Sequence, residues 1–224
     1  MNVYYAAVAV IIPVTLALLF LAMKKRRSGH LKRSLEMSLF LIRLPRYESE
    51  GEKGDIKEMI ARIEQFYANF IDLDRGNGPI KRFFQGLPRV AFEIASELGG
   101  NDISFYVGVP SEYEEAINKY IQGVYPGAVL EKRSGDYTVF EPGGEVSASY
   151  LKLKETFYLP INTYRDLGSD PLDPITNSIS SITPNEGSAI QIMIRPAPFN
   201  IRKKGEEVLS LLVSEGMTLT QAVS

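Results

Sequence analysis

The feature that most constrains this chain is an uncharged, apolar stretch near its N-terminus. From Ala6 to Met23 no side chain carries a charge, and Pro13 and Thr15 are the only interruptions. A helix of roughly 20 apolar residues crosses a hydrocarbon core of about 30 Å. The stretch therefore predicts a single transmembrane helix.

The residues at its two ends predict how this helix is oriented. Tyr4 and Tyr5 precede it, and tyrosine is enriched where a membrane meets water. Four basic residues follow it, and basic residues are enriched on the cytoplasmic side of a membrane. These four are Lys24, Lys25, Arg26 and Arg27. The sequence predicts an inner (cytoplasmic) membrane protein, single-pass, with its N-terminus outside and its C-terminal domain in the cytoplasm.

The same basic residues predict a contact with membrane lipid. Anionic lipid attracts each basic residue near the inner surface by roughly 1 kcal/mol. We expect the four basic side chains to lie on that surface, with Lys32 and Arg33 close behind. This contact explains them without any catalytic or DNA-binding role.

Two other interpretations of the stretch fit the sequence less well. A cleaved signal peptide carries its positive charge before the apolar core, whereas Met1 to Tyr5 contains no basic residue. A buried helix of a soluble domain would be broken by Pro13 at a cost of about 3 kcal/mol. Membrane helices tolerate proline when neighbouring groups satisfy the freed carbonyl.

Composition bounds the chemistry of the 224 residues. The chain has no cysteine, which excludes disulfides, thiol catalysis and cysteine-bound metals. Its one histidine, His30, falls in the basic segment, where we expect a solvated residue and not a metal ligand. The formal net charge is −2 although the N-terminal segment is basic. The remainder is therefore acidic, and we expect no direct nucleic-acid binding from it.

The residues after the basic segment alternate between strand and helix patterns. Apolar side chains recur at every second position in the expected strands and at every third or fourth in the expected helices. The order strand–helix–strand–strand–helix–strand predicts an α+β fold, specifically a ferredoxin-like domain with a four-stranded antiparallel sheet. The expected strands are Leu35–Leu44, Arg89–Glu97, Ile103–Val109 and Ala128–Lys132, and the expected helices start at Asp55 and Pro110.

Local signals predict how two helices begin. Ser111 and Glu114 have the spacing of a capping box, in which the two side chains bond free N–H groups of the first turn. Asp173 followed by Pro174 predicts the start of another helix, with the aspartate as its N-cap.

The region after residue 133 is less regular. It contains strand candidates at Tyr137–Phe140, Val146–Leu153 and Ala189–Arg195, and an amphipathic helix from Ile201 to about Glu215. The predicted organisation is an anchor with its basic segment at 1–27, a linker at 28–33 and a ferredoxin-like domain at 34–133. A second, smaller α/β region at 134–215 and a tail at 216–224 follow.

Residue patterns typical of catalysis are missing. The chain contains no phosphate-binding G-x-x-x-x-G-K-[ST] loop and no G-x-S-x-G serine. Asp170 and Asp173 each precede proline, and Glu186 precedes glycine, which is typical of turns and caps. We therefore assign no catalytic, cofactor-binding or metal-binding residue, and we expect a protein that is not an enzyme.

The stretch from Tyr158 to Pro196 resembles a known family. Its segments YLPINTY, DPL with PITNSIS, and EGSAIQIMIRP are similar to the region ahead of the ATPase core in type IV secretion and conjugative DNA-transfer ATPases. The residues that fit the family pattern are Pro160, Asp170, Pro171, Leu172, Ser180, Glu186, Gly187, Gln191, Arg195 and Pro196. The pattern consists of folding residues and not of catalytic ones.

The resemblance implies a function by protein–protein contact. In such ATPases this region anchors the motor and helps to hold subunits together. It implies a membrane-tethered assembly or docking module whose partners are membrane lipid, further copies of itself or an ATPase subunit of a secretion system. The nucleotide-binding motifs of the family are missing from this sequence. The alternative is a stand-alone bitopic membrane protein whose cytoplasmic ferredoxin-like domain senses a ligand or regulates a partner.

Overall fold

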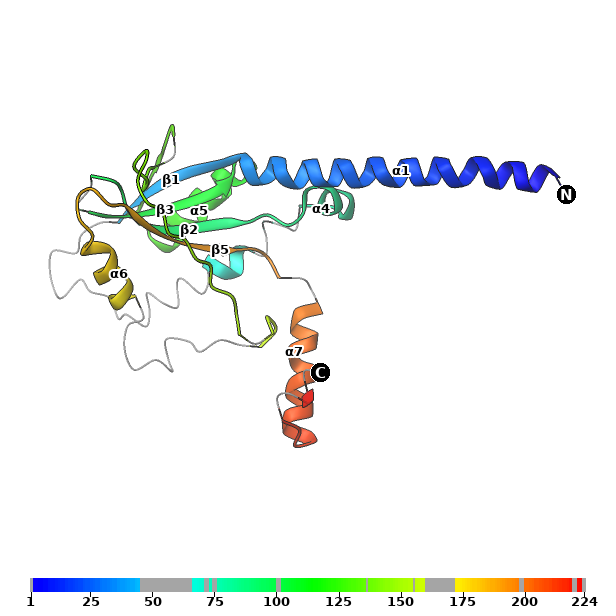
Figure 1. Cartoon of the computed structure of the whole chain (residues 1–224). Coiled ribbons are helices and arrows are strands. Elements are labelled where there is room, and N and C mark those ends of the chain that lie inside the picture. Colours follow the sequence, from blue (N-terminus) through cyan, green and yellow to red (C-terminus); the bar gives the residue numbers. More distant parts are fainter. Residues whose placement is uncertain are drawn as a thin grey trace. The chain divides into compact units, whose positions relative to one another are not determined.

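The computed structural model is drawn in Figure 1. The residues that it describes are 2–44, 66–70, 73, 76–99, 102–135, 137–154, 156–159, 172–197, 200–218 and 221–222. The chain divides into two compact units, which are described separately. The first contains Met1–Glu93, Phe105–Asp136 and Gln191–Pro196, and the second contains Ile94–Ser104, Tyr137–Ile190 and Ala197–Ser224.

The first unit begins with one long helix, α1, which spans Asn2–Leu35. At 1.5 Å per residue its 34 residues extend for about 50 Å. The segment at 28–33, expected as a linker, lies within this helix. Only Glu36 separates α1 from the first strand, so the helix leads directly into the sheet (Figure 1).

Among the residues that the structure describes, no helix has the length and hydropathy required to cross a membrane.

The sheet has five strands in the order β4-β1-β3-β2-β5. Strand β1 pairs antiparallel with β3 on one side and with β4 on the other. The mixed α+β class is therefore confirmed. The strands are β1 (Met37–Arg43), β2 (Val90–Ser96), β3 (Ile103–Pro110), β4 (Val129–Lys132) and β5 (Ser188–Ile194).

Strand β5 differs from the sequence-based expectation in its place and not in its existence. The sequence predicts a strand at Ala189–Arg195 within a second region. The structure has this strand at Ser188–Ile194, where it is the neighbour of β2 and extends the main sheet at one edge. Alternation of apolar residues predicts a strand, but it does not tell which sheet the strand joins.

A hydrophobic core lies between the sheet and helix α5 (Glu114–Val124). Ile117 and Ile121 on α5 are buried against Val107 and Val109 on the central strand β3. The helix expected from Asp55 lies largely outside the described residues. Its described part, Phe66–Phe70, contributes aromatic rings that pack edge-to-face with Phe92 on β2.

The predicted capping box at the start of α5 is wrong. A 3-10 turn, η2 (Ser111–Tyr113), precedes the helix, and neither η2 nor α5 has a side-chain cap. Ser111 and Glu114 bond instead to residues of the first strand and its approach, Ser38 and Glu36. Both side chains that the local pattern assigned to the helix cap therefore form tertiary hydrogen bonds instead.

Helix α4 (Pro79–Gln85) has no counterpart among the elements predicted from the sequence. It begins with proline, where the lost N–H costs nothing. It ends at Gly86, whose φ of 74° suits glycine. Seven residues form fewer than two turns, which is too short for a helical period to stand out from a single sequence.

The second unit contains helices α6 (Asp173–Ser180) and α7 (Asn200–Ser214). Their buried residues are Ile179 and Val208. The burial of Val208 agrees with the amphipathic helix expected from Ile201. Asp173 is the first helical residue and makes no side-chain cap, so its predicted N-cap role is wrong.

The strand candidates at Tyr137–Phe140 and Val146–Leu153 are also wrong. Neither segment forms a strand where the structure describes it. The first segment is nevertheless held in place, because the Leu98 amide donates a 2.9 Å hydrogen bond to the Thr138 carbonyl.

Candidate functional site

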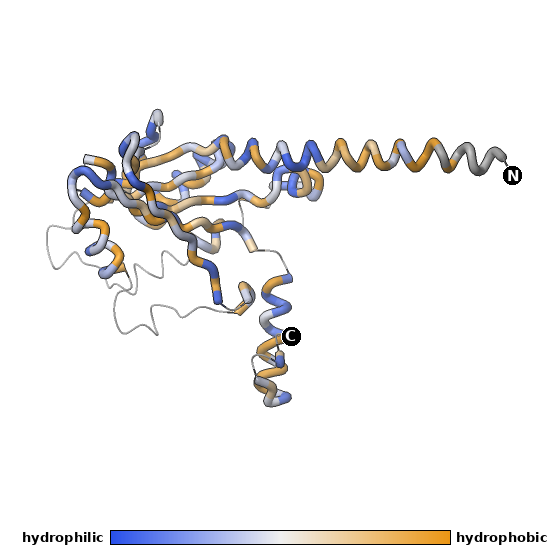
Figure 2. Tube along the Cα trace, in the orientation of Figure 1, coloured by the Kyte–Doolittle hydropathy of each residue, from blue (hydrophilic) through white to orange (hydrophobic). Residues whose placement is uncertain are grey.

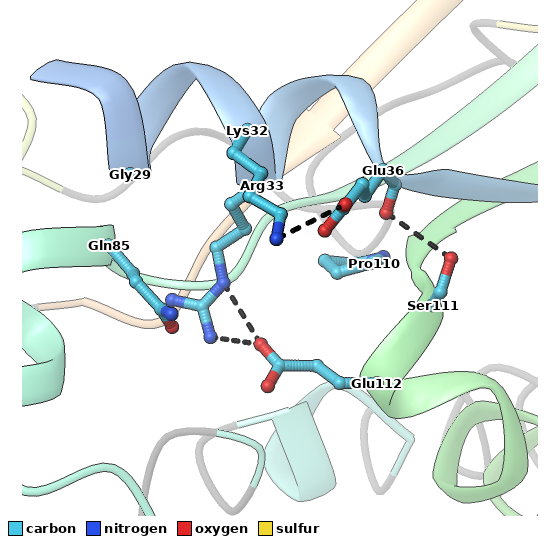
Figure 3. Close-up of a pocket in the computed structure, with 8 residues that line it drawn as sticks. All are labelled: Gly29, Lys32, Arg33, Glu36, Gln85, Pro110, Ser111 and Glu112. Carbon is cyan, nitrogen blue, oxygen red and sulfur yellow. Dashed lines mark hydrogen bonds and ion pairs between the residues drawn. The ribbon is translucent and has the colours of Figure 1, made fainter.

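The junction between α1 and the sheet is built on one buried charge. The Arg33 side chain is only 8% exposed, and its guanidinium points to the Glu112 carboxylate (Figure 3). Arg33 Nε donates to Glu112 Oε1 at 3.1 Å, and Nη2 donates to the same oxygen. Two further hydrogen bonds go to the Gly86 carbonyl at 2.5 Å and to the Tyr113 hydroxyl at 3.0 Å. A buried charge needs such complete pairing to be tolerated.

The same cluster ties helix α4 to the start of α5. Lys81 on α4 donates to the other Glu112 oxygen at 2.6 Å. Asn77, just before α4, is buried and donates to the Tyr113 hydroxyl at 2.7 Å. One carboxylate and one phenol therefore connect α1, α4 and η2. We call Arg33, Lys81, Glu112, Tyr113 and Asn77 the junction cluster.

The cations of the junction cluster keep Glu112 ionised. Burial acts to raise the pKa of its carboxyl group, but hydrogen bonds from Lys81 and Arg33 and their positive charges outweigh this effect. The pKa of Glu112 therefore lies below its ordinary value. A carboxylate that accepts hydrogen bonds from two cations is a structural partner and a poor proton acceptor at neutral pH.

A second polar cluster ties β1 to α5 and β4. The hydroxyls of Ser38 and Ser111 lie 3.0 Å apart, and Ser38 also donates to Glu114. Lys132 on β4 donates to both oxygens of Glu114, at 2.7 and 2.8 Å. Hydrogen bonds from Lys132 and Ser38 lower the pKa of the Glu114 carboxyl.

Helices α1 and α4 approach closely because each has a glycine where the other helix packs against it: Gly29 on α1 and Gly86 at the end of α4. A Cβ on Gly29 would overlap the backbone carbonyl oxygen of Phe84. A Cβ on Gly86 would lie 2.7 Å from the ring of His30. His30 is therefore packed against α4, and the expectation of a solvated linker residue is wrong. Its Nε2 atom is buried and has no hydrogen-bond partner among the described residues.

The structure separates the basic residues that the sequence had grouped. Lys25 lies over the ring of Phe84 at 5.3 Å, and Arg26 lies over the ring of Phe83 at 4.9 Å. The four basic residues after Met23 are exposed, as a surface contact requires. Arg33 is buried in the junction cluster, so its predicted contact with lipid is wrong.

The family-pattern residues that the structure describes make folding contacts. Gln191 on β5 donates to Glu93 on β2 at 2.7 Å, which ties the edge strand to the sheet. Glu186 accepts from the amide and hydroxyl of Thr183, at 2.9 and 3.0 Å, so it is the turn residue that the sequence predicts. Those two hydrogen bonds lower the pKa of Glu186.

The other family-pattern residues that the structure describes differ in their burial. Pro196 is buried, whereas Leu172, Ser180 and Arg195 are exposed. A Cβ on Gly187 would overlap the backbone of Val139. Pro160, Asp170 and Pro171 lie outside the described residues.

The hollow beside the junction cluster is small. It has a volume of about 160 Å³ and is lined by Gly29, Lys32, Arg33, Glu36, Gln85, Pro110, Ser111 and Glu112 (Figure 3). Binding sites for small molecules usually measure roughly 300–1,000 Å³ and are mostly apolar. A hollow of about 310 Å³ lies over the turn formed by Lys132, Arg133, Ser134 and Gly135, where the lining is a single polar turn.

The charged side chains of the two clusters are engaged in ion pairs with one another. Among the described residues, no three His, Cys, Asp or Glu side chains converge as metal ligands would. What the site does is fix the direction in which α1 leaves the sheet.

The close approach of α1 and α4 gives a test with opposite signs at two helical glycines. In an open helix position, Gly→Ala stabilises by roughly 0.5–1 kcal/mol. Gly123→Ala on α5 should do so, because a Cβ there meets no atom within 4 Å. Gly29→Ala should instead destabilise by about 1–3 kcal/mol, because α4 must move away from the new methyl group. Urea unfolding of the full chain in mild detergent measures both. Two changes of the same sign would contradict the packing of α1 on α4.

The lowered pKa of Glu112 predicts a dependence of stability on acid. Because the folded-state pKa lies below the unfolded one, the ion pair stabilises fully above the ordinary glutamate pKa of about 4.3. That stabilisation is lost as the pH falls through the folded-state value. Glu112→Gln should therefore be less stable than the wild type at pH 7 and should lose less stability on acidification. Unfolding free energies of both proteins, measured at pH 7 and at an acidic pH below the folded-state pKa of Glu112, test this prediction.

A matched control for this titration is available on α5. Glu115 also has a lowered pKa, through Lys119, but the pair is exposed. Exposed pairs are screened by solvent and contribute little, so Glu115→Gln should follow the wild-type acid profile closely. If the stability of Glu112→Gln also follows the wild-type acid profile, the ion pairs of Glu112 do not stabilise the junction cluster.

Comparison with known proteins places the chain in a family. The family described as a domain of unknown function (DUF8128) matches residues 81–212, from α4 to α7. No curated protein and no solved structure matches the chain. Because the family match covers more than half of the 224 residues, the chain belongs to the DUF8128 family.

Proposed function

We propose that the chain is a membrane-tethered docking module of a type IV secretion or conjugative DNA-transfer ATPase, acting by protein–protein contact and not by catalysis. The observation that carries the tether is the continuity of α1. One helix runs from an apolar segment through a basic one into β1, and the junction cluster locks it to the sheet.

The apolar part of α1 supports membrane insertion. Hydrophobic residues make up most of this part of α1 (Figure 2), and the large apolar side chains from Val10 to Met23 are 51% to 68% exposed. Exposed apolar surfaces of this extent mark sites of membrane or protein contact. The exposed side chains are Val10, Ile11, Ile12, Val14, Leu16, Leu18, Leu19, Phe20, Leu21 and Met23.

The hydroxyl of Thr15, the one polar side chain of the apolar segment, is satisfied within the helix. The Thr15 hydroxyl donates to the carbonyls of Ile11 and Ile12, at 3.0 and 2.8 Å. In a bilayer, polar groups must find partners inside the segment because water is absent. This agrees with membrane insertion. The proposed topology, argued from the basic residues Lys24 to Arg27, is a single pass through the inner (cytoplasmic) membrane with the N-terminus outside and the C-terminal domain in the cytoplasm.

The domain after the tether is best described as ferredoxin-like with one added strand. Its strands follow the order β4-β1-β3-β2, with β1 antiparallel to β3 and β4. This is the order that a split βαβ repeated twice produces. Strand β5 adds an edge beside β2.

The partner assignment rests on the resemblance of Tyr158–Pro196 to the region ahead of the ATPase core. A docking role agrees with a site whose charges are internally paired and whose hollow is small. The ligand-sensing alternative has less support, since ligand sites are usually larger and apolar.

Two measurements test the function together. Reading the genomic DNA past Ser224 and through the adjacent genes should reveal a Walker-type ATPase, in frame or next door. That ATPase should co-purify with the full chain from detergent-solubilised membranes, and an unrelated single-pass protein should not retain it. A gene without such a neighbour, or an ATPase that does not co-purify, would overturn the partner assignment.

The tether is tested separately by washing the membranes with carbonate. The wild-type chain should remain in the membrane pellet. Leu16→Arg with Leu19→Arg should release it, because each arginine at the centre of a span costs roughly 2.5–3.5 kcal/mol. Release of the wild type by the same wash would refute the tether.

A further inference from the structure

Helix α4 presents apolar and basic side chains on its open face. Ile80 is 74% exposed and Phe83 is 47% exposed, although both are large and apolar. Lys81 and Arg82 lie between them in the sequence, and Arg82 is exposed. Bulky apolar residues beside basic ones are typical of helices that lie at a membrane surface.

The position of α4 is fixed by its contacts with α1. Arg26 lies 4.9 Å from the ring centre of Phe83, and Lys25 lies 5.3 Å from that of Phe84. Gly29 brings the two backbones into contact at Phe84. Helix α4 therefore lies alongside the basic part of α1, just after its apolar part (Figures 1 and 2).

This position corresponds to the depth of lipid headgroups. Arg26 follows Met23 by three residues, which is about 4.5 Å along a helix. The headgroup layer on each side of a bilayer is roughly 5–8 Å thick, from a core of about 30 Å and a total of about 40–45 Å. If Met23 ends the apolar span, Phe83 lies within this layer.

We propose that α4 is a second membrane contact, which rests on the anionic inner leaflet beside the tether. Ile80 and Phe83 enter the boundary between headgroups and acyl chains, and the basic residues Lys24 to Arg27 of α1 bind lipid phosphates. This inference rests on the membrane tether of the proposed function and adds a site of lipid binding to it.

The charge of the surroundings favours an anionic lipid surface as the occupant. Among the described residues, the charges next to the rings of α4 are basic: Arg26 lies over Phe83 and Lys25 over Phe84. Both belong to the exposed basic run Lys24–Arg27 of α1. The Glu112 carboxylate is paired with Arg33 and Lys81. An anionic leaflet complements this surface, and its apolar interior accepts Phe83 and Ile80.

The chain has no tryptophan, so a single introduced indole reports on depth without background. Phe83→Trp in the full chain is reconstituted in vesicles of phosphatidylcholine with phosphatidylserine, both carrying brominated acyl chains. We expect the indole at position 83 to lose most of its emission. The matched control is Phe105→Trp, because Phe105 is 44% exposed and pairs with Ile42 at the far end of β1 from α1. The indole of this control variant should keep its emission.

The dependence on lipid charge separates headgroup binding from simple proximity. Quenching in the Phe83→Trp variant should fall when phosphatidylserine is replaced by phosphatidylcholine, and it should also fall in high salt. Ile80→Trp provides a second probe on the same face, in case Phe83→Trp alters the packing against Arg26. Quenching at positions 80 and 83 that is no greater than at position 105, or that is independent of phosphatidylserine, would overturn the proposal.

A flotation measurement distinguishes a failure of the membrane tether from a failure of the α4 contact. Flotation of the same vesicles on a density gradient reports whether the chain is inserted. A chain that does not float with the lipid refutes the tether and the α4 contact together. A Phe83→Trp chain that floats while its indole stays unquenched refutes only the α4 contact.

Discussion

The buried guanidinium of Arg33 is the interaction on which the arrangement of the first unit depends. A charge taken out of water is stable only when its donors are all met by well-placed acceptors. Those acceptors come from η2 and from the end of α4, through Glu112, Tyr113 and Gly86. These two elements must therefore assemble around the last turn of α1. A helix held in this way has a fixed direction relative to the sheet that it enters.

The sequence predicts most elements of the sheet but not the contacts that orient them. Alternating apolar residues locate β1, β2, β3 and β5 within two or three residues. They do not tell which face of β1 meets the core, because Leu39 and Phe40 are both apolar. In the structure Phe40 is buried in the core and Leu39 is only partly buried. The choice is made by the helices that pack on the sheet, which single-residue patterns do not encode.

The errors at the junction share one physical cause, which is a partner distant in the sequence. Arg33 follows the lipid-facing basic residues and is grouped with them by its position, but its carboxylate partner lies 79 residues away. Ser111 and Glu114 have the spacing of a local cap and are bonded instead to Ser38, more than 70 residues earlier. Short-range patterns predict well only where no stronger long-range partner competes.

The segment that carries α1 and β1 precedes the family match but contributes a strand to the sheet. The matched residues, 81–212, begin after β1, yet β1 lies between β3 and β4 and completes their pairing. The strand that joins β3 to β4 is thus supplied by the segment that carries α1.

Along α1 the surroundings proposed here change from acyl chains to headgroups and then to protein. The boundary between the headgroup part and the protein part of α1 is defined by the groups that neutralise its basic residues. In the proposed arrangement, lipid phosphates neutralise the residues from Lys24 to Arg27. Glu112 pairs with Arg33, six residues beyond Arg27 and about 9 Å further along the axis. A single helix can pass through all three surroundings only if the last charge has its own protein partner, which is the role that Glu112 fulfils.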